Sequence, residues 1–466
     1  CQSTYSQFTW QRTYSKNNQA IGNDVCQTLD GNFVIGGTSL VAGFGYGVFA
    51  LKINDIGDTL WTATPLLISG HPYEGLAITA TIDGGTVIVG SGDSTFMVKL
   101  NQTGDIVWLK FYQGYTTQCF DIMATPEGGF IACGRNFSFN SEGFVIKVNS
   151  SGQLEWQRIY SGFSGAFNSI DIDNGGGYVI TGDVNMGGGD TTKTFILKIN
   201  SNGDTLWQKK YKINNRGAAA KKIIKQNQFY LIGGLTIDSL IHDQIFFMKI
   251  DLNGNVILTK TYPTGIYNDY FNTISVINNN KYVISYERDS SSTLFLNAIA
   301  IITDSLGNIS RKNVFTSEPH FRWGSLRTII PLTSGDILFA GTAKLNPSGE
   351  IVVYAVRTDS LLNTPTYIGI ANGSTIVPNK FILYQNFPNP FNSSTDILYE
   401  IKQRSYVRIE IFDILGRRVK VIVDKLNEVG KFKVNLNLNE YSSGLYFLKL
   451  TIDNTSYQII KMILIK

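Results

Sequence analysis

Residues 52–61 read Lys-Ile-Asn-Asp-Ile-Gly-Asp-Thr-Leu-Trp, and close copies of this stretch return about every 50 residues, at 99–108, 147–156 and 198–207. A fifth copy at 249–258 keeps Gly254 but has leucine in place of the tryptophan. Self-similarity at a fixed period of this length is typical of solenoids, arrays and propellers. The repeat therefore indicates the fold class before any local pattern is considered.

A second recurring element lies upstream of each copy. It contains a tight turn with glycine or asparagine, which tolerate the positive φ that such turns need, followed by alternating apolar residues that predict a strand. The element occurs seven times, at 28–37, 83–90, 127–134, 174–182, 227–234, 279–285 and 334–341. Seven copies predict seven structural units.

Each unit contains four expected strands: one that starts at the tryptophan, two that flank the tight turn, and one that ends in Lys-Ile-Asn. Four antiparallel strands per ~50 residues are typical of a propeller blade. We therefore predict an all-β protein with a seven-bladed β-propeller over 10–360, in which Trp10 starts a first strand. Copies six and seven, between about 254 and 359, have drifted from the pattern, and we expect the specific surface there.

The repeated residues have a structural interpretation. Because similar aromatic residues occur in most copies, we expect them to fill the space between neighbouring blades, where large side chains bury the most area, rather than to bind a sugar. We predict that the lysine of Lys-Ile-Asn is a solvated strand residue. The positions assigned to the blade repeat are Trp10, Trp61, Trp108, Trp156, Trp207, Gly57, Gly104, Gly152, Gly203 and Gly254.

Composition excludes several classes of function. The chain of 466 residues carries 40 Lys+Arg and 36 Asp+Glu. Residues 381–466 hold 12 and 8 of these, so the remainder is balanced at 28 and 28, and duplex nucleic acids, which need a clustered basic surface, are not expected partners. No run of 18 apolar residues predicts a transmembrane segment.

The sequence nominates no catalytic, cofactor-binding or metal-binding residue and no cofactor. Its three histidines, His71, His242 and His320, have no metal-ligand spacing. Scattered carboxylates could meet at one face of the propeller and support an enzyme, namely Glu74, Asp93, Glu142 and Asp183.

The N-terminus suggests export. The four cysteines do not form a dense disulfide framework, and we expect Cys26, Cys119 and Cys133 to be free thiols. Two interpretations of residues 1–9 stay open. Cys1 carries a lipid anchor and the residues after it form a tether, or the segment is the remnant of a signal peptide.

The repeat stops after residue 360. Residues 361–380 are rich in Asn, Thr, Pro, Gly and Ser and predict a linker, and residues 381–466 contain six or seven short alternating segments. Such a pattern over about 80 residues favours a small immunoglobulin-like β-sandwich.

Several motifs in 381–466 resemble the C-terminal sorting domain, type A, of the type IX secretion system of Bacteroidetes-related bacteria. They are Pro388-Asn389-Pro390-Phe391, the strand before Gly416, and Ser443-Gly444-Leu445-Tyr446. The resemblance implies the type IX machinery as a partner and passage across the outer membrane to the surface or exterior of a Gram-negative bacterium. It also implies that the domain is commonly removed on export, with a cut in 361–380.

These observations favour an exported, non-enzymatic protein whose propeller serves binding or assembly. Within this class, a retained tail could join subunits into a filament or layer, because a head-to-tail contact that does not close gives a fibre. The competing classes are a carbohydrate-active propeller enzyme, either a hydrolase or a lyase, and a lectin for a surface glycan. The enzyme predicts a deep pocket with two carboxyls and a perturbed pKa.

Overall fold

The computed structural model describes residues 9–466 apart from 16–18, 42–44, 68–72, 93, 113–116, 138–140, 161–163, 174, 186–191, 240–241, 264–266, 278–279, 291–292, 317–320, 346–347, 365–380, 385, 387, 402–403, 414–416 and 454–455. The chain divides into two compact units, Cys1–Ser374 and Thr375–Lys466. In the part of the chain that the structure describes, no helix is long and apolar enough to cross a membrane.

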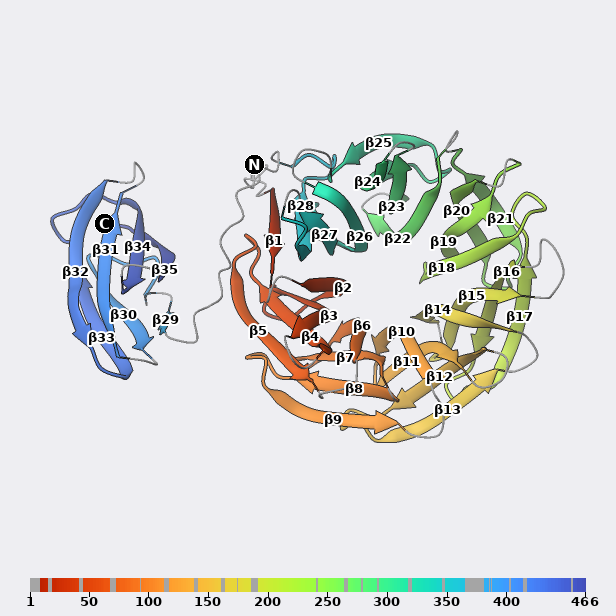
Figure 1. The fold of residues 1–466 in the computed structure, drawn as a ribbon, viewed down its shortest axis with the longest axis horizontal. Helices are drawn as coiled ribbons and strands as arrows, with labels where there is room; N and C mark the ends of the chain where they lie inside the picture. The colour runs from red at the N-terminus through yellow and green to blue at the C-terminus, as the bar shows by residue number, and fades with distance from the viewer. Residues whose placement is uncertain are drawn as a thin grey trace. The chain divides into compact units, whose positions relative to one another are not determined.

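The first unit is a ring of seven four-stranded antiparallel sheets, which confirms the predicted seven-bladed propeller (Figure 1). The innermost strands of blades 1 to 7 are β2 (Ala20–Gln27), β6 (Glu74–Ala80), β10 (Thr117–Ala124), β14 (Ser164–Ile172), β18 (Ala218–Lys225), β22 (Asp269–Ile277) and β26 (Phe321–Pro331). The second strands are β3 (Phe33–Val41), β7 (Thr86–Ser91), β11 (Phe130–Asn136), β15 (Tyr178–Asn185), β19 (Phe229–Ile237), β23 (Lys281–Ser290) and β27 (Ile337–Leu345).

The third strands are β4 (Gly45–Ile53), β8 (Thr95–Leu100), β12 (Glu142–Val148), β16 (Thr192–Ile199), β20 (Asp243–Asp251), β24 (Thr293–Thr303) and β28 (Ile351–Thr358). The outermost strands are β5 (Thr59–Leu66), β9 (Ile106–Tyr112), β13 (Leu154–Tyr160), β17 (Thr205–Tyr211), β21 (Val256–Thr261), β25 (Ile309–Val314) and, in blade 7, β1 (Trp10–Tyr14).

The grouping of strands predicted from the sequence was wrong by one strand. The strand that begins at each tryptophan is the last and outermost of its blade, and β1 pairs with β28 rather than with β2. The reason is the five-residue turn before it. In Asn54–Asp58, the Asn54 side chain accepts the backbone N–H groups of Ile56 and Asp58 and folds the tryptophan strand back onto β4. The N-terminal strand therefore closes the ring by completing blade 7.

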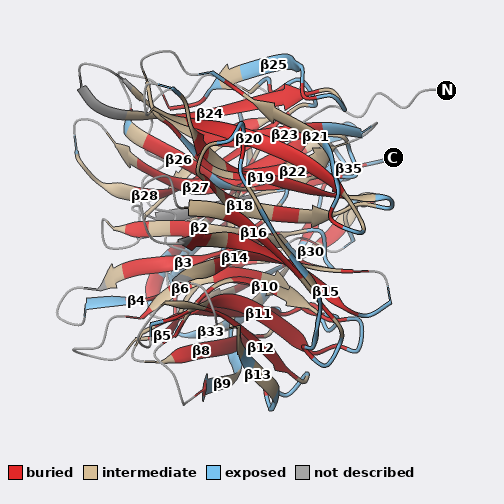
Figure 2. Cartoon of the chain, turned by 90° about the vertical axis from the view of Figure 1, so that its right-hand side faces the viewer, coloured by how far each residue is buried: buried red, intermediate tan, exposed pale blue. Residues whose placement is uncertain are grey.

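Apolar burial lies between blades rather than within them. Seven clusters of buried side chains each join two neighbouring blades, and the cluster that contains Trp10, Phe49 and Val353 joins blade 7 to blade 1. The outer strands carry most of the exposure, as β25 shows (Figure 2). Each blade thus depends on both of its neighbours for a core.

The repeated aromatic and glycine residues form a contact between blades that we name the outer clamp. The tryptophan of one blade donates its indole N–H to a turn carbonyl of the next blade, from Trp10 to Asp55 at 3.0 Å and from Trp61 to Gln102 at 2.9 Å. Trp108 and Trp156 do the same with Ser150 and Ser201. A tyrosine four residues on often donates its hydroxyl to the glycine carbonyl of that turn; the pairs are Tyr14–Gly57, Tyr112–Gly152, Tyr160–Gly203 and Tyr211–Gly254.

The clamp glycines need their lack of a side chain. Gly104 has a φ of 86°, and a Cβ there would lie 2.9 Å from the Trp61 ring. Gly203 has a φ of 85°, and its Cβ would meet Trp156 and Arg158. Only glycine adopts this backbone conformation without strain and lets the indole approach the turn. Trp207 lies against Gly254 in the same way.

The lysines of Lys-Ile-Asn are not solvated strand residues, so that prediction was wrong. The Lys52 side chain is 3% exposed and its ammonium lies 2.7 Å from the Asp30 carboxylate. Lys99, Lys147 and Lys198 pair likewise with the acidic residue near the tight turn of their own blade, Asp83, Glu127 and Asp173. The ammonium groups can be buried because each has a carboxylate beside it.

The second unit is the predicted small β-sandwich. One sheet has the order β29 (Phe381–Leu383), β30 (Ser394–Ile401) and β33 (Gly430–Asn437), and the other has the order β32 (Arg418–Asn427), β31 (Ser405–Phe412), β34 (Gly444–Ile452) and β35 (Ser456–Leu464). One cluster of buried apolar side chains fills the space between the sheets.

The motif at 388–391 holds the last strand of the sandwich. The Asn389 side chain accepts the backbone N–H of Ile463 and donates to the carbonyl of Lys461, while buried Phe391 exchanges backbone hydrogen bonds with Ile463 and Ile465. The Pro388 carbonyl accepts the Thr395 hydroxyl, and the peptide bond before Pro390 is cis.

Tyr446 closes the second motif by donating its hydroxyl to the Ser442 carbonyl, 2.8 Å away. Nothing in the structure explains why residue 444 is glycine, since a Cβ there would have open space. Gly416 and Cys1 lie outside the described residues. The three described cysteines, Cys26, Cys119 and Cys133, are free thiols.

Candidate functional site: the axial cavity

Every innermost strand carries a β-bulge at the same position. The pairing with the second strand shifts by one residue at Gly22/Asp24 in β2, and an equivalent shift occurs in β6, β10, β14, β18, β22 and β26. A bulge leaves one extra residue outside the ladder and re-aims its side chain. The seven extra residues form what we name the bulge ring: Asn23, Leu76, Phe120, Asn168, Lys221, Asn272 and Arg327.

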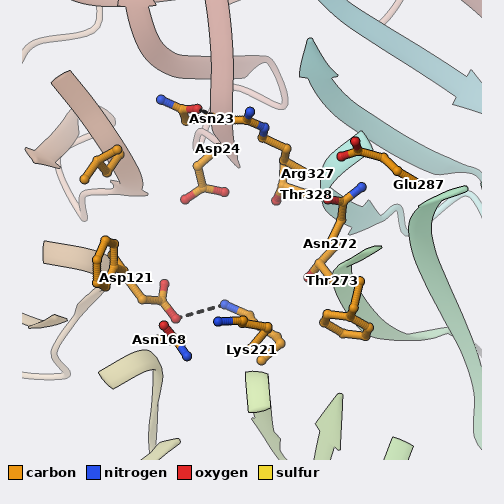
Figure 3. A pocket seen from close by; sticks show the side chains of 14 residues that line it. Asn23, Asp24, Asp121, Asn168, Lys221, Asn272, Thr273, Glu287, Arg327 and Thr328 are labelled. Atoms are coloured by element: carbon orange, nitrogen blue, oxygen red, sulfur yellow. Dashed lines mark hydrogen bonds and ion pairs between the residues drawn. The ribbon is translucent and has the colours of Figure 1, made fainter. Parts of the chain in front are cut away.

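The residues that follow them form a second ring, made of Asp24, Ala77, Asp121, Ser169, Lys222, Thr273 and Thr328. The bulge ring, five members of the second ring, and Phe271 and Glu287 line a cavity of about 390 Å³ at the propeller axis (Figure 3). Four members of the second ring are buried, whereas all members of the bulge ring are partly or fully exposed. The bulge ring is therefore the accessible part of the site.

An ion pair crosses the cavity. Lys222 of blade 5 places its ammonium 3.0 Å from the Asp121 carboxylate of blade 3, past the intervening blade 4. The same carboxylate accepts the Ser169 hydroxyl at 2.7 Å and the backbone N–H of Ile170 at 3.1 Å. Burial alone would lower the pKa of Lys222, but the carboxylates of Asp121, Asp24 and Asp171 outweigh burial and raise it, so the ammonium stays charged.

Asp24 is a second carboxyl near the axis, and it is partly buried. It accepts the backbone N–H of Val25 at 2.8 Å and that of Ile78, in the next blade, at 3.0 Å. Burial raises its pKa to about 6, against the opposing effects of the Ile78 N–H and the Lys222 ammonium. Asp24 thus both ties blade 1 to blade 2 and titrates near neutrality.

The amides of the bulge ring also bridge neighbouring blades. Asn23 donates to the Gly75 carbonyl at 2.7 Å and accepts from Arg327, and Asn168 donates to the Ala220 carbonyl at 2.8 Å. The Asn272 amide interacts with the Glu287 carboxylate of the adjacent strand β23 in its own blade.

The remaining charges at the cavity are matched. Lys221 lies 3.4 Å from the Asp183 carboxylate, which also accepts a hydrogen bond from Asn168. Burial raises the pKa of Glu287, while Ser325, the Arg327 guanidinium and the Asn272 amide act against this effect. Within the described residues, no group of three histidine, cysteine or carboxylate side chains is placed to hold a metal ion.

The four carboxylates that the sequence nominated do not form the site. None of Glu74, Glu142 and Asp183 lines the cavity, although Asp183 contacts its margin, and Asp93 is outside the described residues. The drifted copies supply six of the 14 lining residues, and the other five blades supply eight. The tryptophans and glycines of the repeat lie in the outer clamp instead.

Sequence reasoning missed Asp24, Asp121, Lys222 and Glu287. A usable signal was present in five of the seven innermost strands, where two polar residues precede a β-branched apolar residue, as in Asn168-Ser169-Ile170. This pair breaks the alternation expected of a strand with one buried face and marks the bulge.

Comparisons with known proteins identify the second unit. Residues 385–466 match the family model described as the secretion system C-terminal sorting domain, which confirms the resemblance found in the sequence. This type IX domain implies secretion to the extracellular or cell-surface side in Bacteroidetes and interaction with the secretion machinery, so the chain is a secreted protein. No curated protein sequence matches the chain.

Solved structures resemble the propeller only distantly. One is a protein of unknown function from Bacteroides caccae, with 13% identity and a TM-score of 0.38 over 60% of this chain and 90% of that chain. A protein of unknown function from Dyadobacter fermentans has 8% identity and a TM-score of 0.40 over 75% and 97%. A Synechocystis apocarotenoid oxygenase variant has 11% identity and a TM-score of 0.43 over 78% and 95%. None of these likenesses bears on function.

Proposed function

We propose that this secreted protein is a non-enzymatic binding protein whose propeller holds a small polar ligand in the axial cavity. One observation carries the proposal: the charged groups of the cavity are engaged with one another, with the backbone or with neighbouring polar side chains. Asp121 binds Lys222, Ser169 and a backbone N–H at the same time. Matched, pre-positioned polar groups suit ligand binding, since they need no rearrangement when the ligand arrives.

Proton transfer is poorly served by the same arrangement. A general base must be free to take a proton near the working pH, and Asp121 already accepts an ammonium, a hydroxyl and an amide. Lys222, held charged by three carboxylates, is neither a base nor a nucleophile at neutral pH.

The test measures binding of monosaccharides, amino acids and nucleotides to the full chain by intrinsic tryptophan fluorescence and thermal shift. We expect at least one compound to bind to the unaltered chain and not to the Asn272→Ala variant. NMR after a day of incubation should show that this compound is chemically unchanged. Turnover of a bound compound would contradict the non-enzymatic proposal. Binding that Asn272→Ala and Lys222→Met both leave unaltered would place the site elsewhere.

A carbohydrate-active hydrolase or lyase is the second candidate, and the pKa of Asp24 favours it. A carboxyl with a pKa of about 6 can act as a general acid at neutral pH, and Asp121 supplies a second carboxyl in the same cavity. This candidate requires cleavage of a glycan that Asp24→Asn abolishes while binding persists. An absence of cleavage across plant, algal and bacterial polysaccharides would remove it.

The fate of the two ends is a separate proposal. We propose that the sorting domain is removed on export by a cut within 361–380; the alternative is a retained domain that joins subunits into a filament or layer. The resemblance of 385–466 to secretion sorting domains supports removal. Intact mass spectrometry of the native protein distinguishes the two, and the same spectrum shows whether Cys1 carries a lipid.

A further inference from the structure

We infer that the ligand of the axial cavity is an uncharged carbohydrate residue, held with its apolar face on the Leu76–Phe120 side and its hydroxyls toward Lys221, Asn272 and Arg327. The inference deepens the proposed function and rests on it. It follows from the balance of charge in the cavity, from the two-sided composition of the bulge ring, and from the pairing of Asn272 with Glu287.

The charge balance selects a neutral ligand. The cavity lining contains three acidic residues, Asp24, Asp121 and Glu287, and three basic residues, Lys221, Lys222 and Arg327. Lys222 is paired with Asp121, and Lys221 lies beside Asp183. An ionic ligand that contacted Lys222 or Asp121 would have to displace the other member of the pair and leave it without a partner, which is costly. Hydroxyl groups can add to paired charges without separating them.

The bulge ring has an apolar side and a polar side. Leu76 and Phe120 come from the adjacent blades 2 and 3, and both side chains are partly exposed. Lys221, Asn272 and Arg327 come from blades 5, 6 and 7 across the axis, as Figure 3 shows for these labelled residues. A pyranose has the same division, because its axial C–H groups form an apolar face that packs on an aromatic ring while its hydroxyls lie around the edge.

Phe120 is held in place by its neighbours. The Arg135 guanidinium lies 5.8 Å from the centre of the Phe120 ring and donates a hydrogen bond to Gln118 at 3.0 Å. A cation within ~6 Å of a ring is attracted to its face. The aromatic surface is therefore positioned before any ligand arrives, which lowers the entropic cost of binding.

The Asn272–Glu287 pair completes the argument. The Asn272 amide interacts with the Glu287 carboxylate, and a sugar hydroxyl can add to this pair by accepting from the amide and donating to the carboxylate. The cavity volume of about 390 Å³ falls within the ~300–1,000 Å³ usual for small-ligand sites.

The experiment titrates the full chain with glucose, galactose, mannose and N-acetylglucosamine, and in parallel with glucuronate, galacturonate and glucosamine, by saturation-transfer NMR and calorimetry. We expect one neutral sugar to bind at least tenfold more tightly than its charged counterpart, with less than a twofold change in Kd between 50 and 500 mM NaCl. Phe120→Ala is expected to weaken binding at least tenfold and Asn272→Ala about fivefold. Phe111→Ala, on the outer strand β9, is the matched control and is expected to change nothing.

Each other outcome overturns a distinct statement. Tighter binding of a uronate or an amino sugar overturns the neutral class and leaves the axial site intact. Binding of a compound that is not a sugar, lost in Asn272→Ala, overturns the carbohydrate assignment but not the proposed function. Cleavage of a bound glycan overturns the non-enzymatic proposal and leaves the ligand class standing. Sugar binding unaffected by Phe120→Ala overturns the site, and no binding of any compound overturns both proposals.

Discussion

At the outer edge of the propeller the same side chains recur from blade to blade, whereas around the axis the same backbone bulge recurs with different side chains. In the clamp, Trp10, Trp61, Trp108 and Trp156 all donate to a turn carbonyl of the next blade. In the bulge ring, the equivalent positions hold asparagine, leucine, phenylalanine, lysine and arginine. The difference separates what joins the blades from what can recognise a ligand.

Removal of a clamp tryptophan should cause the largest loss of stability and leave ligand binding unchanged. Trp108→Ala removes a half-buried indole and its hydrogen bond to Ser150, so we expect the free energy of unfolding to fall by about 2–4 kcal/mol in urea titrations. Leu206→Ala, at a 57% exposed position on β17, should cost less than about 0.5 kcal/mol. If a Trp108→Ala variant that still folds lost ligand binding, the separate roles of the outer clamp and the axial cavity would be contradicted.

Removal of the axial ammonium should affect both stability and binding. Lys222→Met leaves the Asp121 carboxylate, whose side chain is 11% exposed, without its cation, and we expect a loss of about 2 kcal/mol at pH 7, discounted for partial exposure of the lysine. Because Lys222 also lowers the pKa of Asp24, the loss should shrink below pH 6 as Asp24 takes up a proton and no longer attracts the ammonium. Lys110→Met, at an exposed position of β9, is the control and should leave the urea midpoint unchanged. An equal loss at pH 4 and pH 7 would contradict the electrostatic role.

The pH dependence of stability should report Asp24. Its pKa is about 6 in the folded chain and 3.8 in the unfolded chain, so the folded state binds more protons between these values and stability falls as pH rises from 4 to 6. At ~1.4 kcal/mol per pKa unit, the fall from this group is about 2–3 kcal/mol. We expect Asp24→Asn to flatten this part of the curve of unfolding free energy against pH. A curve of unchanged slope in the variant would assign the dependence to other groups.

The smallest expected effect comes from replacing a clamp glycine by alanine, which adds a cost for the positive φ and a cost for the steric contact of the Cβ. Gly203→Ala must adopt a φ of 85° and place a Cβ 2.9 Å from Arg158, whereas Gly31→Ala has a φ of 78° and meets nothing within 4 Å. Positive φ alone costs ~1–2 kcal/mol for a residue with a Cβ. We expect Gly31→Ala to show that cost alone and Gly203→Ala to show about 1 kcal/mol more. Equal losses of stability in the two variants would mean that the clamp side chains move aside to accommodate the added methyl group without cost.

The comparison also explains what the sequence could and could not predict. The clamp residues repeat, so counting Trp61, Trp108, Trp156 and Trp207 with the tight turns was enough to predict seven blades and to find the sorting motif outside them. The assignment of strands to blades was wrong because a repeat length does not show whether a strand pairs with the strand before it or the strand after it. The Asx turn at Asn54 determines that the tryptophan strand pairs with the strand before it.

The axial site was out of reach for a different reason. Asp24, Asp121 and Lys222 are about 100 to 200 residues apart from one another, and they meet only because seven bulges turn seven strands toward one axis. The polar pairs mark most of the bulges in the sequence, but they do not state which side chains meet across the axis. Lys52 was misjudged in a related way, since its burial depends on an acidic partner 22 residues upstream.

The place of β1 in blade 7 has a consequence for how the chain folds. Residues 10–14 pair with 353–357, so the first strand to be made has no partner until almost the whole propeller exists. Closing a loop of this length is slow compared with forming local hairpins. A nascent or truncated chain that stops before β28 would leave β1 and β27 without the strand that pairs with both of them. The edge of β1 is therefore covered only in a chain long enough to include β28, and this pairing removes an open strand edge that could otherwise aggregate.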